Sequence, residues 1–392
     1  MNKLHFDFRD LFRSARLAFS LQRLWIQFVG LVVSYAGYFI LTLVSFIVSG
    51  YRVADVFNQY GLFPCLLIPG VNSNIAGKIL FGLGCLFFIC GLLVTSTAVA
   101  RASFMVLKGN NFYTWREAFG FALKKSGSTL VTPLAIALLA LSFILGAWFI
   151  GLLGRIPFVG ELGVSLLTIV WLAAALFLVF LIIVTAISLI IAPAIIATTD
   201  EDAFEAVFQS FSTVWNQPWR FVVYEGLIGA VSIVGFFILA FFVKRAFLVM
   251  NSLIAFSMAD KFQNLAWQAQ YYLQSWTQEI AGWIQAVFGK FAPLIFFSRD
   301  FIPLQDLTAT VNISAYLYAI NMLIAGGFVV SFLLATFNTG NMISYLILRK
   351  LKDDENLLER KEETFEKIEE KPEEEKKEEK EKVTEEKETT KE

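Results

Sequence analysis

The stretch LWIQFVGLVVSYAGYFILTLVSFIV, from Leu24 to Val48, contains no charged residue. As an α-helix it would be about 37 Å long, which is enough to cross the ~30 Å hydrocarbon core of a bilayer with some tilt. The apolar region of a signal peptide is shorter, roughly 7–15 residues, so this stretch does not fit one. We therefore predict an uncleaved first membrane span over residues 24–48.

The residues before this span predict a helix that lies on the membrane. Residues 1–23 hold one lysine and four arginines against Asp7 and Asp10. Apolar residues recur there at nearly helical spacing: Phe8, Leu11, Phe12, Ala15, Leu17, Ala18 and Phe19. A helix with an apolar face and basic flanks suits the headgroup level of a bilayer. We expect residues 1–23 to form a basic amphipathic helix.

Further apolar runs after residue 48 predict five more spans. The chain is 57% hydrophobic with 41 phenylalanines, whereas soluble domains are about 45–50% apolar. The last run stays apolar to residue 348, roughly 57 Å as one helix, so we expect the Asn338-Thr-Gly-Asn341 cluster to mark its exit from the membrane. The predicted fold is an all-α membrane protein whose polytopic domain covers residues 24–348. Its spans are expected at 24–48, 79–100, 130–153, 164–191, 221–243 and 311–337.

The distribution of basic residues predicts the orientation of these spans. Residues 1–23 contain five Lys/Arg, and the connector 101–128 contains five more. The loops at 51–78 and 154–161 contain two and one. Because short loops rich in Lys/Arg stay in the cytoplasm, we expect a multi-pass protein of a bacterial inner membrane with both termini in the cytoplasm.

Two segments lie outside the spans. Residues 244–310 alternate aromatic residues with glutamines, which favours an extracytoplasmic amphipathic helical segment. It could be a lid packed over the helix ends, or a surface that binds lipid or protein.

From residue 349 to the end, 13 Lys/Arg stand against 19 Asp/Glu, a balance of −6. This charged tail, 349–392, has little to bury, so we expect it to be disordered, coiled-coil-like in composition and dispensable for folding. It is either a spacer or a docking segment.

A repeated pattern groups the spans into three units. Each unit is an amphipathic segment followed by a helical hairpin, and the segments lie near residues 7–22, 113–125 and 202–215. Each has a charged residue, an alanine and an apolar residue ahead of an apolar run. Duplication produces such repeats in membrane proteins. Chance similarity between short amphipathic stretches is the alternative.

Two connectors carry a resemblance to known proteins. The first contains RASF at 101–104 and FYTWREA at 112–118, and the second contains TTDEDAFEA at 198–206 and QPWRFVVY at 217–224. They resemble the connectors of an uncharacterised polytopic bacterial inner-membrane family, which is distantly similar to the membrane domain of glycerophosphodiesterases. The resemblance implies a fold more than an activity, because the soluble phosphodiesterase barrel is absent from this sequence.

Polar residues inside apolar spans are the default candidates for function. Glu225 lies one turn into the fifth span, after Trp219 and Arg220, where it either anchors the helix at the interface or handles a substrate or proton. Asn321 lies near the middle of the sixth span. It would bond either a neighbouring helix or a ligand.

The sequence gives no indication of catalysis. His5 is the one histidine, the three cysteines Cys65, Cys85 and Cys90 have no metal spacing, and no nucleotide or catalytic motif occurs. We expect no cofactor, no metal and no nucleic acid. The favoured hypothesis is a non-enzymatic scaffold or assembly component that contacts membrane lipids and, through its tail and interfacial helices, other proteins. The alternative is a lipid or small-molecule transporter or a transporter subunit.

Overall fold

The computed structural model describes residues 4–66, 73–292, 301–304 and 307–360. Within these residues the chain is helical and contains no β-strand. Six of the described helices are long and apolar enough to cross a membrane: α2 (Leu21–Val48), α4 (Ile75–Lys108), α6 (Ser126–Leu153), α8 (Thr168–Thr199), α10 (Pro218–Met258) and α13 (Ala309–Asp353). The prediction of an all-α chain with six long apolar helices is confirmed.

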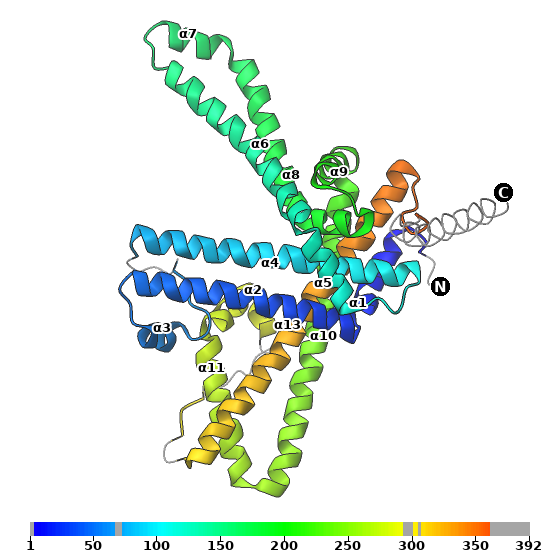
Figure 1. Ribbon diagram of the computed structural model, residues 1–392. Helices are drawn as coiled ribbons and strands as arrows, with labels where there is room; N and C mark the ends of the chain where they lie inside the picture. The colour runs from blue at the N-terminus through cyan, green and yellow to red at the C-terminus, as the bar shows by residue number, and fades with distance from the viewer. Residues whose placement is uncertain (1–3, 67–72, 293–300, 305–306, 361–392) are drawn as a thin grey trace, which may run out of the picture.

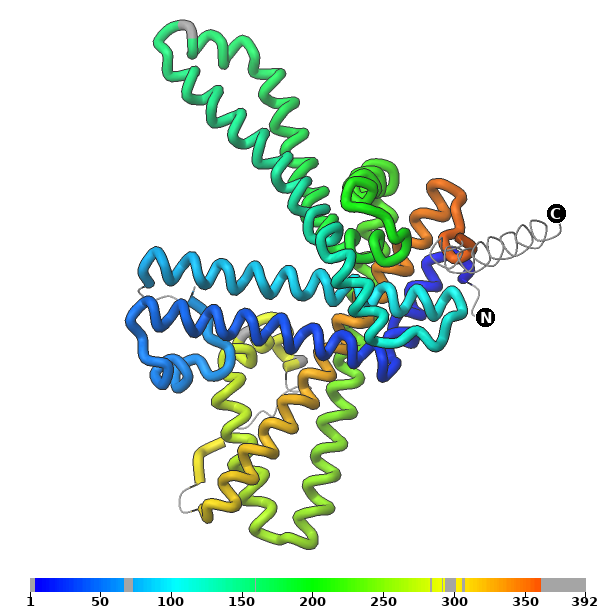
Figure 2. The backbone as a smooth tube through the Cα atoms, viewed as in Figure 1, coloured from blue at the N-terminus to red at the C-terminus, as the bar shows by residue number. Residues whose placement is uncertain are grey.

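The six long helices pair into three arms that point apart from a common region (Figure 1). The first arm is α2 with α4, the second is α6 with α8, and the third is α10 with α13. We call the common region the hub and the opposite ends of the arms the distal ends. The backbone tube shows the same divergence (Figure 2).

Short helices surround the hub and lead into the arms. η1 (Phe8–Phe12) and α1 (Arg13–Ala18) precede α2, α5 (Trp115–Lys124) precedes α6, and α9 (Ala203–Asn216) precedes α10. The described residues 4–23 therefore do not form the single helix that was predicted, because the backbone is extended at Ser20 before α2 begins. The Arg23 side chain donates to the Leu17 carbonyl across this break.

The start of α5 shows why these connectors form helices of their own. The Thr114 hydroxyl accepts a hydrogen bond from the Glu117 N–H at 3.3 Å, and the Glu117 carboxylate accepts one from the Thr114 N–H at 2.5 Å. This reciprocal pair satisfies N–H groups that a helix start leaves unbonded. The hydrogen bonds that the Thr114 N–H and hydroxyl donate to the Glu117 carboxylate hold the pKa of this carboxyl below its usual value.

The long helices extend beyond most of the predicted spans. Five predicted spans lie inside a single helix, whereas the span 164–191 crosses from α7 (Val159–Leu166) into α8, and Leu167 separates the two. α13 is unbroken over 45 residues. The cluster Asn338-Thr-Gly-Asn341 therefore lies within the helix and does not end it, and its place at the membrane exit stays a prediction.

The segment 244–310 forms part of the third arm. α10 continues to Met258, and α11 (Asp260–Phe288) turns back and packs along α13, where Ala269, Ala315 and Ala319 are fully buried. η2 (Gly289–Phe291) follows it. The side chains of Gln268 and Gln274 accept hydrogen bonds from the backbone of residues 304 and 301. These glutamines therefore hold the connection back to α13.

The first and third arms also meet outside the hub (Figure 1). α3 (Val53–Tyr60) follows α2, and the next turn lies against α11, where the Leu62 N–H donates to the Trp276 carbonyl at 3.0 Å. Gly61 has a φ of +61°, and a Cβ there would lie 2.6 Å from the Ser275 carbonyl oxygen. The second arm points away from both of the others (Figure 1). The first and third arms are thus joined to each other both at the hub and outside it, while the second arm is attached only at the hub.

The start of the predicted tail differs from the expectation of a solvated segment. Leu357 is only 2% exposed and belongs to the apolar core of the hub. Arg349 binds the Glu355 carboxylate through two nitrogens at 2.9 and 3.0 Å, and Arg360 binds Glu201 at 2.9 Å. Residues 349–360 therefore return onto the hub, while residues 361–392 lie outside the described residues.

This contact predicts a sharp boundary for truncation. A chain ending at Lys352 loses the buried Leu357, whose burial is worth about 1.5–3 kcal/mol, and it should melt at a lower temperature in detergent. A chain ending at Arg360 keeps the contact and serves as the control, with an unchanged melting temperature. Equal melting temperatures for the two chains would show that residues 353–360 do not stabilise the hub.

Candidate functional site

The hub is built around the last turns of α13. Every residue from Asn338 to Leu348 is buried, on all sides of the helix. An α-helix buried all round needs neighbours in every direction, and α1, α2, α4, α8 and α10 supply them. These helices share one apolar core. Its largest fully buried side chains are Phe104, Leu11, Ile191, Ile195, Ile196, Ile228, Met342 and Tyr345.

Four consecutive residues of α13, Asn338 to Asn341, each contact one of these neighbours, and we call them the hub motif. The Asn338 amide donates to the Gln27 side-chain oxygen of α2 at 2.8 Å. The Thr339 hydroxyl bonds the Ser103 hydroxyl of α4 at 3.0 Å. Both pairs are buried, so each side chain satisfies a polar group that would otherwise be costly to bury. The motif thus joins the third arm to both helices of the first.

The third contact of the motif is the packing of Gly340 against the Ile228 side chain of α10. A Cβ at Gly340 would lie 2.5 Å from the Cγ2 atom of Ile228 on α10, and Ile228 is itself fully buried. Only glycine therefore fits at this point without a shift of α10 or α13. Gly340, one residue of the cluster predicted to mark the membrane exit, is thus a packing residue within the third arm.

The fourth contact involves the predicted site residue Glu225. With its amide nitrogen facing the carboxylate, Asn341 donates to Glu225 Oε2 at 3.1 Å and to the Phe337 carbonyl at 3.2 Å. The other carboxylate oxygen, Oε1, is buried and has no hydrogen-bond partner within the described residues. The structure thus brings Glu225 into the hub motif rather than leaving it at a free helix end.

Arg101 ties the second arm to the same region, and sequence reasoning did not single it out. It lies on α4, is 4% exposed, and donates from Nη1 to the Ala197 carbonyl of α8 at 3.1 Å. This carbonyl is one of the last four of α8, which no residue of the same helix can bond. The guanidinium also lies 4.3 Å from the centre of the Phe121 ring of α5. The position of Arg101 directly after the apolar run 79–100 is the one feature of the sequence that could have indicated this role.

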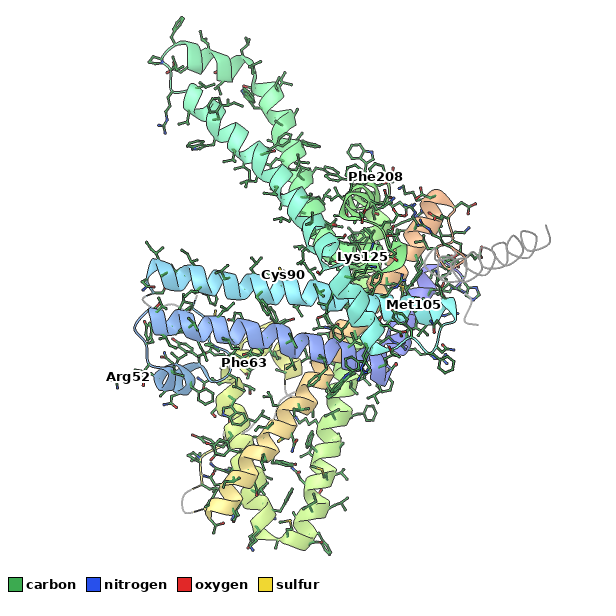
Figure 3. All side chains as sticks on the ribbon, in the orientation of Figure 1. Arg52, Phe63, Cys90, Met105, Lys125 and Phe208 are labelled. Atoms are coloured by element: carbon green, nitrogen blue, oxygen red, sulfur yellow. The ribbon has the colours of Figure 1, made fainter. Side chains whose placement is uncertain are left out.

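A second cation completes the end of α8. Lys125 lies at the hub (Figure 3), and its Nζ atom is 2.7 Å from the Asp200 carbonyl and 3.0 Å from the Asp200 carboxylate. Cations at the C-terminal end of a helix interact favourably with its dipole and with its unbonded carbonyls. Arg101 and Lys125 therefore add polar contacts to the apolar packing of α8 that holds the second arm at the hub.

The other predicted site residues lie apart from the hub motif. Trp219 and Arg220 are exposed at the start of α10, Trp219 by 79%. Asn321 is exposed on α13, seventeen residues before Asn338 and therefore about 25 Å away along the helix. Of the four residues singled out from the sequence, the structure places one, Glu225, in the hub.

The hub motif is a set of packing and hydrogen-bonding groups, not a recognisable reaction centre. The described residues contain no group of three His, Cys, Asp or Glu side chains that could hold a metal ion. Comparison of the chain with protein-family models, curated proteins and solved structures gave no match. The resemblance to the membrane domain of glycerophosphodiesterases stays a prediction. The arrangement supports a mechanical role, in which one helix holds the arms together.

The close approach at Gly340 gives a test of this role. Gly340→Ala should lower the free energy of unfolding by about 1–3 kcal/mol, because the added methyl overlaps Ile228. The same change in an Ile228→Ala background should cost much less, so the two sites should be strongly coupled in a double-mutant cycle. Gly226→Ala on α10, where a Cβ meets nothing within 4 Å, is the control. Additive effects of Gly340→Ala and Ile228→Ala would contradict the contact.

Proposed function

We propose that this chain is a non-enzymatic assembly scaffold of a bacterial inner membrane. The observation that carries the proposal is the divergence of three apolar arms from one interlocked hub (Figure 1). The second arm exposes large apolar side chains on both helices, among them Trp148 at 65% and Leu172 at 59%. Such an arm, braced only at the hub, presents both its helices to lipid and to other membrane proteins.

The hub faces the cytoplasm in this proposal. Of the basic residues that predict the orientation, Arg101 binds the end of α8 at the hub. Lys125 also lies at the hub, whereas Arg52 lies at a distal end (Figure 3). α9 adds support, since Phe204, Phe208 and Trp215 are exposed by 83%, 59% and 74% on its outer face. Exposed aromatic residues at this level suit the headgroup layer of the cytoplasmic leaflet.

The three amphipathic-helix-plus-hairpin units are part of the same proposal. α1, α5 and α9 each lie at the hub directly before an arm, and each buries small or apolar residues there. Phe119 of α5 and Phe211 of α9 both pack against hub clusters. This equivalence of position supports duplication as the origin of the arms.

A transporter of ions or charged substrates is the weaker candidate. Between the hub and the distal ends, the stretches 24–48, 79–100, 126–153, 168–199, 226–243 and 309–348 contain no ionisable Asp, Glu, Lys or Arg. Pathways for ions and protons through membranes generally require such groups. Lipid handling is compatible with apolar arms, and it stays the second candidate function.

Photocrosslinking in native membranes tests the scaffold proposal. A photoreactive amino acid at Trp148 or Leu172 should give a discrete adduct with another membrane protein, because these positions face outward on the second arm. The same residue at Phe46, which is 1% exposed, is the control and should give none. If the second arm yields only lipid adducts over its whole length, the scaffold role fails.

A further inference from the structure

Two cysteines that are far apart in the sequence meet in the first arm. Cys65 lies in the turn 61–66 after α3, and Cys85 lies on α4. Both pack against one apolar cluster, whose buried members include Phe46 and Phe81. Both thiols are free, and both residues are half-buried. The fold thus gathers two of the three cysteines of the chain in one place.

Two tyrosines of α2 fix the position of Cys65. The Tyr38 hydroxyl donates to the Pro64 carbonyl at 2.8 Å, and the carbon of this carbonyl is bonded to the Cys65 nitrogen. The Tyr35 hydroxyl, about one turn away, donates to the Leu62 carbonyl. These two hydrogen bonds hold the turn 61–66 against the side of α2, with Cys65 next to the Tyr38 hydroxyl.

Tyr38 also lies against the part of α4 that carries Cys85. The centre of its ring is 6.1 Å from the Phe81 ring and 6.0 Å from the Phe88 ring. Cys85 lies four residues after Phe81 and three before Phe88, so the three side chains share one face of α4. Cys65 interacts electrostatically with both Tyr38 and Cys85. One tyrosine therefore lies beside both thiols.

The two cysteines lie at the same level of the first arm. Tyr38 is ten residues before the last residue of α2, and Cys85 is ten residues after the first residue of α4. Since α2 and α4 are antiparallel neighbours, both positions are about 15 Å from the distal end. Figure 3 shows Phe63 of the same turn beside α2, further from the distal end than Arg52. A disulfide needs Cα atoms within about 7 Å, and the non-helical turn can move toward α4 more easily than a helix can.

The third cysteine stands apart from this pair. Cys90 lies on α4 five residues after Cys85, which places its side chain about 140° further round the helix. Unlike Cys85, it does not belong to the cluster that contains Cys65. Cys90 is also half-buried and free. It is therefore a matched control on the same helix.

The orientation of the chain decides the chemistry that reaches the pair. With the hub in the cytoplasm, the connector between α2 and α4, which holds Cys65, lies on the extracytoplasmic side. Disulfides form and persist on that side of a bacterial inner membrane, where dithiol oxidases supply them by thiol–disulfide exchange. Two neighbouring thiols there meet a chemical oxidant that cytoplasmic thiols do not meet.

We propose that Cys65 and Cys85 form an intramolecular disulfide, an inference that rests on the orientation in the proposed function. The Cys65 thiolate attacks the disulfide of an extracytoplasmic dithiol oxidase, which gives a mixed disulfide and releases one oxidase thiolate. The Cys85 thiolate then attacks the Cys65 sulfur, forms the new bond and releases the second oxidase thiolate. The protons of the two cysteines pass to these thiolates. The pair loses two electrons, and the oxidase disulfide gains them.

The disulfide strengthens the contact between the first and third arms. The turn that holds Cys65 also donates from the Leu62 N–H to the Trp276 carbonyl of α11, and Gly61 packs against the same part of α11. Without the disulfide, hydrogen bonds and packing hold this turn on the first arm. With it, the turn is bonded covalently to α4, so the contact with α11 is fixed to both helices of the arm.

Thiol counting in native membranes tests the proposal. The full chain is made in a bacterium that oxidises extracytoplasmic thiols, quenched in acid, unfolded in dodecyl sulfate and treated with a maleimide–polyethylene glycol. One thiol, Cys90, should react before reduction, and all three should react after it. Cys90→Ser should leave no reactive thiol before reduction, whereas Cys65→Ser and Cys85→Ser should each leave two. Mass spectrometry of the unchanged chain should find the peptides of Cys65 and Cys85 linked, which requires no substitution.

Oxidation of purified protein separates the pairing from the orientation. In Cys90→Ser, diamide should link Cys65 to Cys85 within one chain, and in Cys85→Ser it should leave Cys65 and Cys90 unlinked. Absence of the link in purified, monodisperse Cys90→Ser would overturn the pairing, whatever the orientation. A link in purified protein with three reactive thiols in membranes would overturn the disulfide in the cell. Labelling of Arg52→Cys, with the natural cysteines replaced by serine, by an impermeant maleimide on spheroplasts then shows whether the orientation has failed as well.

Discussion

The structure depends on how closely α13 approaches its neighbours at one level. A helix that is buried on every side must either be apolar throughout or satisfy each polar group that it carries. The hub motif does the second, with a buried hydrogen bond to α2, another to α4, and a carboxylate of α10 bound by Asn341. Gly340 permits the approach itself, since any larger side chain meets Ile228. The three arms diverge from the level of the hub motif.

Each arm has its own means of attachment, and this gives the arms different freedom. The first is bound to the third at the hub and again outside it, through Leu62 and Trp276. The second is held by Arg101 and Lys125 at the C-terminal end of α8, where exposed carbonyls favour cations. Apolar packing around Ile136 and Val184 supports it on the side of α9. The second arm is therefore the part of the chain most accessible to a partner.

Much of this fold could be predicted from the sequence, because length and the absence of charge decide whether a helix can cross a membrane. The run from Leu24 to Val48 needed no other information. The meaning of the hub motif could not be predicted in the same way. A polar cluster at the end of an apolar run is equally typical of an exit from the membrane and of hydrogen-bonded groups in a core. The partner of Asn338 is Gln27, which is far away in the sequence and gives no local pattern. The burial of Leu357 could not be predicted for a similar reason, since the pair Leu357-Leu358 in a charged tail gives no periodic signal. Glu225 was recognisable as an unusual residue, but its partner Asn341 was not.

The central claim is that the arms converge at the hub motif and diverge from it, and distances between spin labels in lipid nanodiscs test it most directly. One pair of labels replaces Arg52 and Arg155, at the distal ends of the first and second arms. The other replaces Leu21 and Lys124, at the hub ends of the same arms. The account predicts a much longer distance for the distal pair than for the hub pair. Similar distances for the two pairs, as in a bundle of parallel helices, would contradict it.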